Sequence, residues 1–489
     1  MREVGKAALL CFLLLATACT RRAQEAPAPT LVLQPCQLEG LSAPARCGTL
    51  EVWEDREAQR GRKVALRVAV VPALAASPQP DPLFFLAGGP GQSAVDVAGQ
   101  VLPALERIRR ERDLVFVDQR GTGESRPLDC DTEPADAGLS ERYATTFDPA
   151  PLRRCLAGYD ADPRLYTTPI AMDDLDEVRQ ALGYARINLY GISYGTRAAL
   201  VYLRRHGAHA RAVVLDGVAP PGLKLPLYMA RDSQRALDLL FQHCAADAGC
   251  SKAYPQLRQR FEKLLARLKE APVHTRVAHP LTGVVEDVVI PFDAFVSNLR
   301  GMLYLSEATA LVPLVLHRAE QGDWGPFVAS TLGLQDGFSE SFSSGMLLSV
   351  VCAEDQPFTR EEDIVREAKG TWAGEGIARN LLRACEVWPR GKVAGDFHQP
   401  VRSEVPVLLL SGELDPVTPP SWGEEAHRHL PHSLHVTVPG VGHNTLGAGC
   451  VRSVMADFLA RGSVEGLTPT CDKAGSRPPF FTSFAGPQP

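Results

Sequence analysis

Short apolar runs alternate with amphipathic stretches along much of the chain, and this rhythm predicts the class of fold. Runs that suit buried parallel strands cover residues 83–86, 114–117, 187–190 and 212–215, and each ends close to a Gly or an Asp. Between them, residues 173–182 place apolar side chains at helical spacing, with acidic residues in the first turn. This alternation predicts an α/β protein with a mostly parallel, eight-stranded sheet and helices on both faces.

The rhythm changes after Asp216. From residue 220 to residue 395 the pattern is mostly helical, and strand signals return only at residues 405–410 and 434–438. A helical block between two strands of one sheet predicts an inserted, mainly helical cap. The expected units are a core in two parts (residues 36–219 and 396–475), the cap (residues 220–395) and an irregular tail (residues 476–489).

The N-terminus has the pattern of an export signal. Basic residues precede an apolar run over residues 7–16, which is too short to span a bilayer because a spanning helix needs about 20 residues. We expect a signal peptide over residues 1–18 and a tether, rich in Ala and Pro, over residues 19–35. The Ala-Thr-Ala-Cys sequence that ends at Cys19 resembles a bacterial lipobox, although Leu15 stands one place too early. A lipid anchor on Cys19 and simple secretion, to the periplasm or beyond, are both open.

Composition narrows the class of protein without deciding its chemistry. The chain has 489 residues, of which 45% are hydrophobic and 22% charged, as in soluble globular proteins with a large core. The formal net charge of −6 gives no electrostatic case for nucleic acid as a partner. No apolar stretch after the N-terminal one is long enough to span a membrane.

The cysteines agree with export to an oxidising compartment. Of 12 cysteines, ten remain once Cys11 and Cys19 are set aside, and an even number in an exported chain indicates disulfides. Buried free thiols are the alternative. The cysteine spacing does not suit zinc, and we expect neither a metal nor a cofactor. Pairing between sequence neighbours joins Cys36 with Cys47, Cys130 with Cys155, Cys244 with Cys250, Cys352 with Cys385, and Cys450 with Cys471.

The candidate nucleophile is Ser193, in the Gly-Ile-Ser-Tyr-Gly sequence of residues 191–195. This G-x-S-x-G sequence stands between an apolar strand and a helical run. In such a turn the serine is held in a strained conformation, and its hydroxyl projects above the carboxyl edge of the sheet. The helix that follows points the positive end of its dipole at the same place. The context predicts a serine hydrolase.

A serine hydroxyl needs an adjacent base, usually His, and an acid that orients the base. His443 lies on a Gly-rich loop after the expected strand at residues 434–438, where the chain order Ser, acid, His places the base. Asp415 follows the preceding strand and is the predicted acid. Glu413 is the alternative acid, and Asp216 is expected to cap the end of a strand. Four nearby histidines are expected at ordinary exposed positions: His427, His429, His432 and His435.

The negative oxygen that develops during acyl transfer needs two backbone N–H donors. One is expected from Tyr194 and the other from Gly89, within the Ala-Gly-Gly-Pro-Gly-Gln-Ser loop of residues 87–93. Pro90 has no N–H group, and the lack of a following Gly-Lys-Ser/Thr argues against a phosphate-binding loop. Residues 118–125 are expected to brace these loops and to take no part in the chemistry.

Together these motifs resemble a known family. They are similar to the prolyl and tripeptidyl aminopeptidases of the α/β-hydrolase superfamily, and most of all to an exported tripeptidyl-aminopeptidase-like branch of bacteria. The resemblance covers roughly residues 47–471 and implies a capped α/β-hydrolase fold. The segments that carry it are residues 88–93, 118–123, 191–197 and 214–218 and those around Asp415 and His443.

Carried over residue by residue, the resemblance implies that Ser193 is the nucleophile, Asp415 the acid and His443 the base. It also implies that Gly89 and Tyr194 form the oxyanion hole. The function implied is the release of short peptides or single residues from free N-termini through an acyl-enzyme. A carboxylesterase or lipase with the same triad is one alternative, because the cap decides between ester and peptide substrates. A non-catalytic binding protein on a hydrolase scaffold is another.

Two positions bear on the choice of substrate. Ala87 stands where prolyl aminopeptidases usually have His before Gly-Gly-Pro-Gly, which argues against proline-specific cleavage. Amine recognition in such enzymes uses acidic residues of the cap, and the Cys-Ala-Glu-Asp sequence at residues 352–355 resembles a stretch of the tripeptidyl branch. Glu354 is therefore the candidate partner for a substrate ammonium, held in place by a bridge from Cys352 to Cys385. A solvated Glu on the cap is the alternative.

Overall fold

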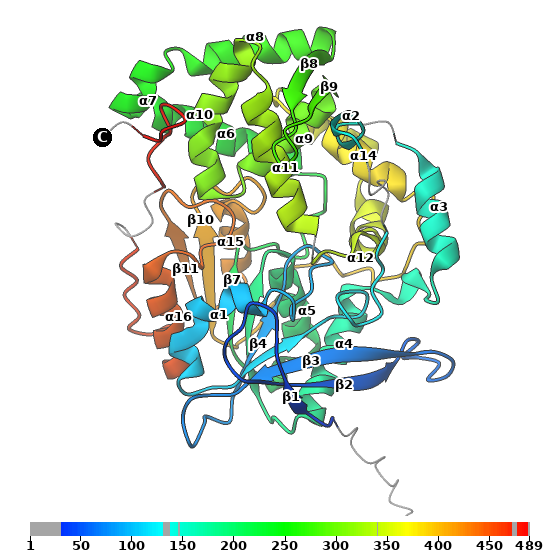
Figure 1. Ribbon diagram of the computed structural model, residues 1–489. Coiled ribbons are helices and arrows are strands. Elements are labelled where there is room, and N and C mark those ends of the chain that lie inside the picture. The colour runs from blue at the N-terminus through cyan, green and yellow to red at the C-terminus, as the bar shows by residue number, and fades with distance from the viewer. Residues whose placement is uncertain (1–30, 131–136, 145–146, 340, 472–476, 488–489) are drawn as a thin grey trace, which may run out of the picture.

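Nine strands form one sheet, and the apolar runs of the sequence supply its centre (Figure 1). The computed structural model describes residues 31–130, 137–144, 147–339, 341–471 and 477–487. Its strand order is β1-β2-β3-β5-β4-β6-β7-β10-β11, parallel from β5 to β11 and antiparallel from β1 to β5. The strands are β1 (Gln34–Cys36), β2 (Ala45–Trp53), β3 (Lys63–Val71), β4 (Leu83–Leu86), β5 (Leu114–Val117), β6 (Ile187–Ile192), β7 (Ala210–Asp216), β10 (Val407–Gly412) and β11 (Ser433–Val438).

The mostly parallel α/β sheet is confirmed, but it has nine strands and not the predicted eight. The three-residue strand β1 is an element that periodicity misses, because Gln-Pro-Cys has no apolar alternation. Antiparallel pairing with β2 and the disulfide from Cys36 to Cys47 hold β1 at the edge of the sheet. It begins inside the segment expected to be a tether. The expected signal peptide and Cys19 lie outside the described residues.

Helices cover both faces of the sheet because alternate residues of a buried strand point to opposite sides. On one face, Phe84 and Leu189 pack with residues of α4, α5 and α15. On the other, Phe85 and Tyr190 pack with residues of α1 and α16, which lie side by side in Figure 1. The helices on the two faces are α1 (Ala98–Arg109), α4 (Thr168–Ala181), α5 (Tyr194–His206), α15 (Pro420–His427) and α16 (Gly449–Arg461). Along the chain, α2 (Leu139–Arg142) and α3 (Pro149–Gly158) come between β5 and β6.

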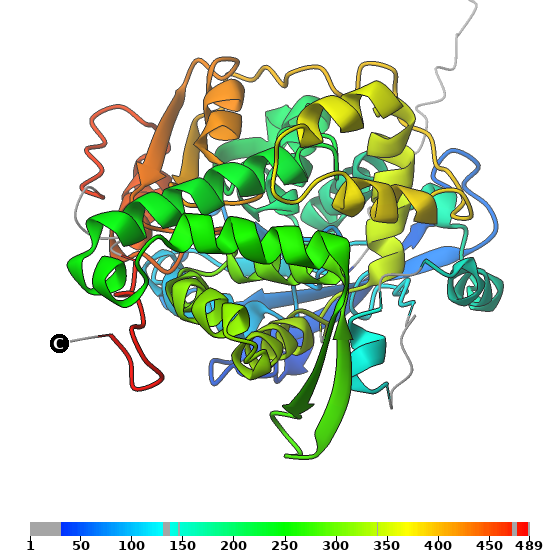
Figure 2. The same ribbon diagram turned by 90° about the horizontal axis from the view of Figure 1, so that it is seen from above.

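The segment between β7 and β10 is mainly helical and lies over the carboxyl ends of the strands, as Figures 1 and 2 show. Its helices have an apolar core of their own, which contains Phe261, Phe295 and Phe327. The elements are α6 (Met229–Ala246), α7 (Ala248–Ala253), α8 (Leu257–Glu270), the hairpin of β8 (Val273–Ala278) and β9 (Val285–Ile290), α9 (Phe292–Met302), α10 (Ser306–Glu320), α11 (Gly325–Ser339), α12 (Ser344–Val350), α13 (Glu361–Ala368) and α14 (Gly376–Ala384).

The described part of the tail packs against this segment. Phe480 is buried in the same apolar core, and the amide of Phe481 donates to the carbonyl oxygen of Ala310 at 3.2 Å. The hydroxyl of Tyr254 donates to the carbonyl oxygen of Phe481 at 2.8 Å. The tail contains no helix or named strand in its described residues, yet it contributes to the core of the inserted segment.

All five disulfides expected between sequence neighbours form. Such a set is typical of proteins that fold in an oxidising compartment. Among the described residues, no helix combines the length and the apolar character that crossing a membrane requires.

The disulfides should differ in their effect on stability, because a bridge that closes a longer loop restricts the unfolded chain more. The bridge from Cys352 to Cys385 spans 33 residues and that from Cys244 to Cys250 spans 6. Replacing the first pair by Ala should lower the free energy of unfolding by about 4 kcal/mol, and replacing the second by about 2 kcal/mol. Urea denaturation followed by tryptophan fluorescence measures both, and equal losses would contradict the loop-length argument.

Candidate active site

The order of the strands reverses at β4, and the predicted site lies at this switch point. The chain passes from β4 to β5 on one side, and β6 later pairs with β4 on the other. In open parallel sheets, ligands usually bind at such a point, outside the carboxyl ends of the strands. The loop of residues 87–93 follows β4, and Ser193 follows β6. A cavity of about 630 Å³ is lined by both and by residues of the inserted helical segment.

Ser193 occupies a strained turn between β6 and α5. Its φ is 56° and its ψ is −121°, a combination that residues with a side chain rarely adopt. Its amide donates to the carbonyl oxygen of Asp216 at 2.9 Å, and α5 begins at the next residue, Tyr194. A Cβ atom at Gly195 would collide with the carbonyl oxygen of Leu86. Only glycine at that position lets the turn lie against the end of β4.

Asp415 and His443 form a buried hydrogen-bonded pair. The imidazole Nδ1 lies 2.8 Å from Asp415 Oδ2, and the same carboxylate accepts the amides of Val417 and Thr418 and the hydroxyl of Thr418, each at 2.8 Å. Burial alone would raise the pKa of Asp415. The adjacent His443 and these hydrogen bonds outweigh burial and hold the pKa below its ordinary value. The carboxylate therefore stays ionised and orients the imidazole.

Glu413 and Asp216 hold the loop around His443 and form no hydrogen bond with its imidazole. Glu413 Oε2 accepts the amide of Gly440 at 2.8 Å. Asp216 Oδ1 accepts the amide and the hydroxyl of Thr445, each at 2.9 Å. Burial raises the pKa of Asp216 to about 6. Of the three candidate acids, only Asp415 is hydrogen-bonded to the imidazole.

The inserted helical segment also supports His443. The amide of His443 donates to the carbonyl oxygen of Tyr304 at 2.8 Å, and the Tyr304 ring meets the imidazole edge-on with ring centres 5.3 Å apart. The amide of Gly442 donates to the hydroxyl of Ser306 at 3.1 Å. Neither Tyr304 nor Ser306 belongs to a sequence motif, and only the packing of α9 and α10 brings them to this loop.

Both predicted oxyanion donors line the cavity together with Ser193. Gly89 has φ +106°, which favours glycine. The amide of Gly88 donates to Gln92 Oε1 at 3.2 Å, whereas that of Gly89 forms no such bond. Tyr194 is the first residue of α5, and the first amides of a helix have no acceptor within it. The two amides are therefore available to one oxygen in the cavity.

Residues 118–125 brace this loop, as predicted. Asp118 is completely buried, and its Oδ1 accepts the hydroxyl of Ser93 at 2.7 Å. Arg120 is equally buried and donates to both carboxylate oxygens of Asp174, at 2.6 and 2.9 Å. These bonds join the loop after β5 to the loop after β4 and to α4.

Comparison with known proteins agrees with the fold and the motifs. Residues 81–269 match the family model described as the alpha/beta hydrolase fold. The chain therefore has the α/β-hydrolase fold. Residues 371–471 match a second family model, described as TAP-like protein.

Three relatives are similar to this α/β-hydrolase along most of its length. Serine protease Hip1 of Mycobacterium tuberculosis is 25% identical over 457 residues, which cover 86% of each chain. Carboxylesterase B of the same species is 28% identical over 464 residues, covering 87% of this chain and 86% of that one. Tripeptidyl aminopeptidase of Streptomyces coelicolor is 24% identical over 475 residues, covering 88% and 84% respectively. All three names denote hydrolases, which agrees with a hydrolytic enzyme.

In this hydrolase, Glu354 is not placed to meet a substrate ammonium. It lies in a single π-helical turn (Val351–Asp355), completely buried and absent from the residues that line the cavity. Its carboxylate accepts the amide and the hydroxyl of Thr168 at 2.6 and 2.9 Å and lies 3.5 Å from Arg197. A solvated Glu, the alternative from the sequence, is wrong as well. The turn directs the carboxylate at the start of α4, which sequence spacing could not reveal.

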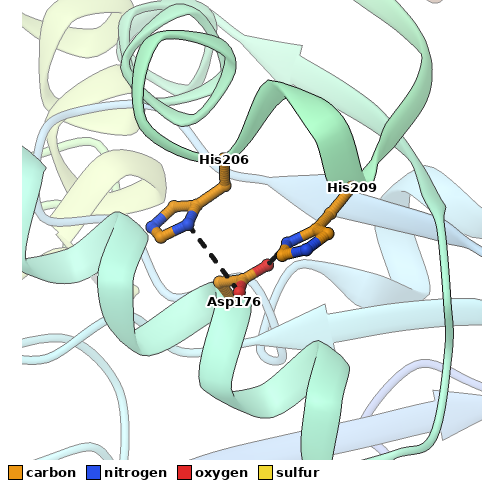
Figure 3. A group of neighbouring side chains, drawn as sticks. All are labelled: Asp176, His206 and His209. Carbon is orange, nitrogen blue, oxygen red and sulfur yellow. Dashed lines mark hydrogen bonds and ion pairs between the residues drawn. The ribbon is translucent and has the colours of Figure 1, made fainter.

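Asp176, His206 and His209 form, among the described residues, a group whose possible metal-ligand atoms lie within 4.8 Å of one another (Figure 3). Asp176 Oδ1 already accepts from His209, Tyr202 and Arg179, at 2.8, 2.7 and 2.7 Å. Burial alone would raise the pKa of Asp176, but these hydrogen bonds lower it to about 2. A divalent cation would have to displace the guanidinium, so we interpret the group as a link between α4 and the end of α5. It stands about 20 Å along that helix from Ser193.

Glu354 should make stability depend on pH. Burial raises its pKa from 4.5 to about 7, so its protonated form contributes stability that is fully present below 4.5 and is lost as the pH rises through about 7. The free energy of unfolding of the wild type should therefore fall relative to that of Glu354→Gln, by about 1–3 kcal/mol, across this range. Urea denaturation at a series of pH values measures the difference.

Glu51→Gln is the control for this prediction, because Glu51 is a well-exposed glutamate on β2 whose side chain is 66% exposed. It should follow the wild type at every pH. A constant difference between the wild type and Glu354→Gln would show that the buried carboxylate does not titrate in this range.

Proposed function

We propose that the chain is a serine peptidase that cleaves short peptides from free N-termini, with Ser193 as nucleophile, His443 as base and Asp415 as orienting acid. The observation that carries the proposal is the 2.8 Å bond between Asp415 and His443, with the imidazole and Ser193 lining one cavity. No hydrogen bond joins Ser193 Oγ to the imidazole in the structure. Such bonds often tighten only in the complex with substrate.

In the proposed reaction, His443 takes the Ser193 proton as Oγ attacks the scissile carbonyl carbon. The amides of Gly89 and Tyr194 stabilise the oxyanion. The imidazolium gives its proton to the leaving amine, the C–N bond breaks and an acyl-enzyme remains. Water, deprotonated by His443, then attacks the ester, and Ser193 recovers its proton. Asp415 stays ionised and stabilises the imidazolium in both halves of the reaction.

Peptides are favoured as substrates by two relatives and by the cavity. The relatives are named serine protease and tripeptidyl aminopeptidase, and the C-terminal segment matches the TAP-like family model. The cavity volume of about 630 Å³ falls within the range of sites for small molecules. This size supports a short peptide and not a folded protein as substrate.

A carboxylesterase is the second candidate, and the lining of the cavity favours it. None of the lining residues that the structure describes is an Asp or a Glu, and many are apolar, as Leu223, Leu225 and Leu347 are. An ammonium group would meet no carboxylate of these residues, whereas an apolar acyl group would lose little on entering. A relative named carboxylesterase B agrees with this alternative.

A fluorophosphonate probe tests the nucleophile. The wild type should be labelled and Ser193→Ala should not, because the probe reacts with an activated serine hydroxyl. Ser453→Ala, which removes a serine on α16 outside the cavity, is the matched control and should be labelled as the wild type is. Equal labelling of Ser193→Ala would overturn the triad. A wild type that resists labelling would return the non-catalytic binding protein to consideration.

Three substrates separate the two activities: a peptide amide with a free N-terminus, its acetylated form, and a p-nitrophenyl ester. The aminopeptidase proposal expects kcat/KM for the free peptide to exceed that for the acetylated one by at least about 10-fold, and expects no turnover by Ser193→Ala. Turnover of the ester alone would identify a carboxylesterase.

Asp415→Asn should lower kcat by about 10⁴-fold, since it removes the group that fixes the imidazole tautomer.

We also propose that the enzyme is exported, with residues 1–18 as signal peptide. The five disulfides support an oxidising destination, because intracellular compartments usually keep thiols reduced. The lipobox-like sequence supports a lipid anchor on Cys19, with free secretion as the alternative.

A further inference from the structure

Helix α9 turns a polar stripe toward the cavity. Its opposite face lies in the apolar core of the inserted segment and includes Phe295, Leu299 and Met302. An amphipathic helix of a soluble protein usually presents its polar face to bulk water. Here that face lines a cavity that Ser193 and His443 also line. The residues of the stripe are Ser297, Asn298, Arg300 and Gly301.

Arg300 carries a buried charge on this stripe. The residue is 8% exposed, and its Nη2 donates to the hydroxyl of Tyr304 at 3.0 Å. Its guanidinium carbon lies 5.1 Å from the centre of the Tyr304 ring, while its Nε has no hydrogen-bond acceptor. No ion pair joins Arg300 to a carboxylate among the described residues. One hydroxyl and one aromatic face leave the positive charge without an anion.

A second arginine that lines the same cavity has carboxylate partners within the protein. Arg197 is also buried, and its Nη1 lies 3.0 Å from Asp355 and 3.5 Å from Glu354. Buried charges are costly unless an opposite charge accompanies them. Arg197 has such partners within the fold, whereas Arg300 faces the cavity without one. The difference indicates that the anion for Arg300 comes with the substrate.

The position of Tyr304, between Arg300 and His443, indicates which part of the substrate carries the anion. The tyrosine contacts Arg300 with its hydroxyl and His443 with its carbonyl oxygen and its ring. In the proposed reaction, His443 protonates the leaving amine, so the leaving group lies beside the imidazole. A group bound to Arg300 is only one aromatic ring away from that position and belongs to the leaving portion of the substrate.

We propose that Arg300 binds a carboxylate on the leaving portion of the substrate, and that the enzyme therefore selects short peptides with a negative charge just beyond the scissile bond. A guanidinium binds carboxylates well because its planar N–H groups match the two oxygens. The carboxylate is either the free C-terminus of a short peptide or an acidic side chain. The inference rests on the proposed peptidase function.

Two pairs of peptides test the proposal. The first compares Ala-Ala-Ala-Ala with its C-terminal amide, and the second compares Ala-Ala-Ala-Glu amide with Ala-Ala-Ala-Gln amide, with products identified by mass spectrometry. The wild type should cleave the charged member of at least one pair with a kcat/KM about 10- to 100-fold above that of the neutral member, the effect of one charge-assisted hydrogen-bonded contact. A preference in the first pair alone identifies the C-terminal carboxylate as the ligand, and one in the second identifies a side chain.

Variants of Arg300 test whether this residue causes the preference for the charged peptide. In Arg300→Met the ratio within the preferred pair should fall to about one, and Arg300→Lys, which keeps the charge, should retain part of it. Arg276→Met is the matched control, since this arginine lies on the β8–β9 hairpin with a side chain 73% exposed, and it should keep the wild-type ratio.

The possible results distinguish a failure of the role of Arg300 from a failure of the proposed peptidase function. Equal kcat/KM within both pairs for the wild type would overturn the role of Arg300 and leave the peptidase standing, and this result needs no variant to fold. A preference unchanged in Arg300→Met would do the same. A wild type that is labelled at Ser193 but cleaves none of the four peptides would overturn the peptidase function and this inference with it.

Discussion

At the end of β7, Asp216 joins the turn of Ser193 to the loop that carries His443. Its carbonyl oxygen accepts the amide of Ser193 at 2.9 Å, and its carboxylate accepts the amide of Thr445, two residues after His443, at 2.9 Å. A strained backbone such as that of Ser193 costs about 1–3 kcal/mol and persists only where its surroundings leave no alternative. Because one buried residue contacts both segments, the positions of the serine and of the imidazole are set together. The other supports of the site are arranged around this link.

The acidic side chains around the site differ in pKa because their surroundings differ. Asp118 and Asp216 brace loops, and burial raises the pKa of each to about 6. Burial also raises the pKa of Glu354, which is hydrogen-bonded to Thr168, to about 7. Asp415 is buried as completely, yet the neighbouring imidazole and three donors near Thr418 hold its pKa below the ordinary value. Burial thus favours neutral forms of the bracing acids, and specific partners keep the acid beside His443 charged.

The inserted helical segment both contacts the loop of His443 and lines the cavity. Tyr304 and Ser306 hold the loop of His443 from above, while α9 supplies Arg300 to the cavity. A change in the packing of α9 would therefore alter the imidazole and the substrate pocket at once. This coupling gives residues without a sequence motif a place in a site whose proposed nucleophile and base both lie in recognisable motifs.

Local sequence by itself determined the mostly parallel sheet and the strand-to-helix turn at Ser193, and it indicated disulfides without deciding which cysteines pair. These features follow from short-range patterns: apolar runs of strand length, glycines where a side chain cannot fit, and an even number of cysteines. The short edge strand β1 was not predicted, because it forms through pairing with β2 and has no hydrophobic periodicity of its own. Only the tertiary structure decided that Asp415 and not Glu413 meets His443, that Glu354 is enclosed behind Thr168, and that Arg300 faces the cavity. Those outcomes depend on which way a side chain points once distant helices and strands have packed, and neither spacing nor composition encodes that direction.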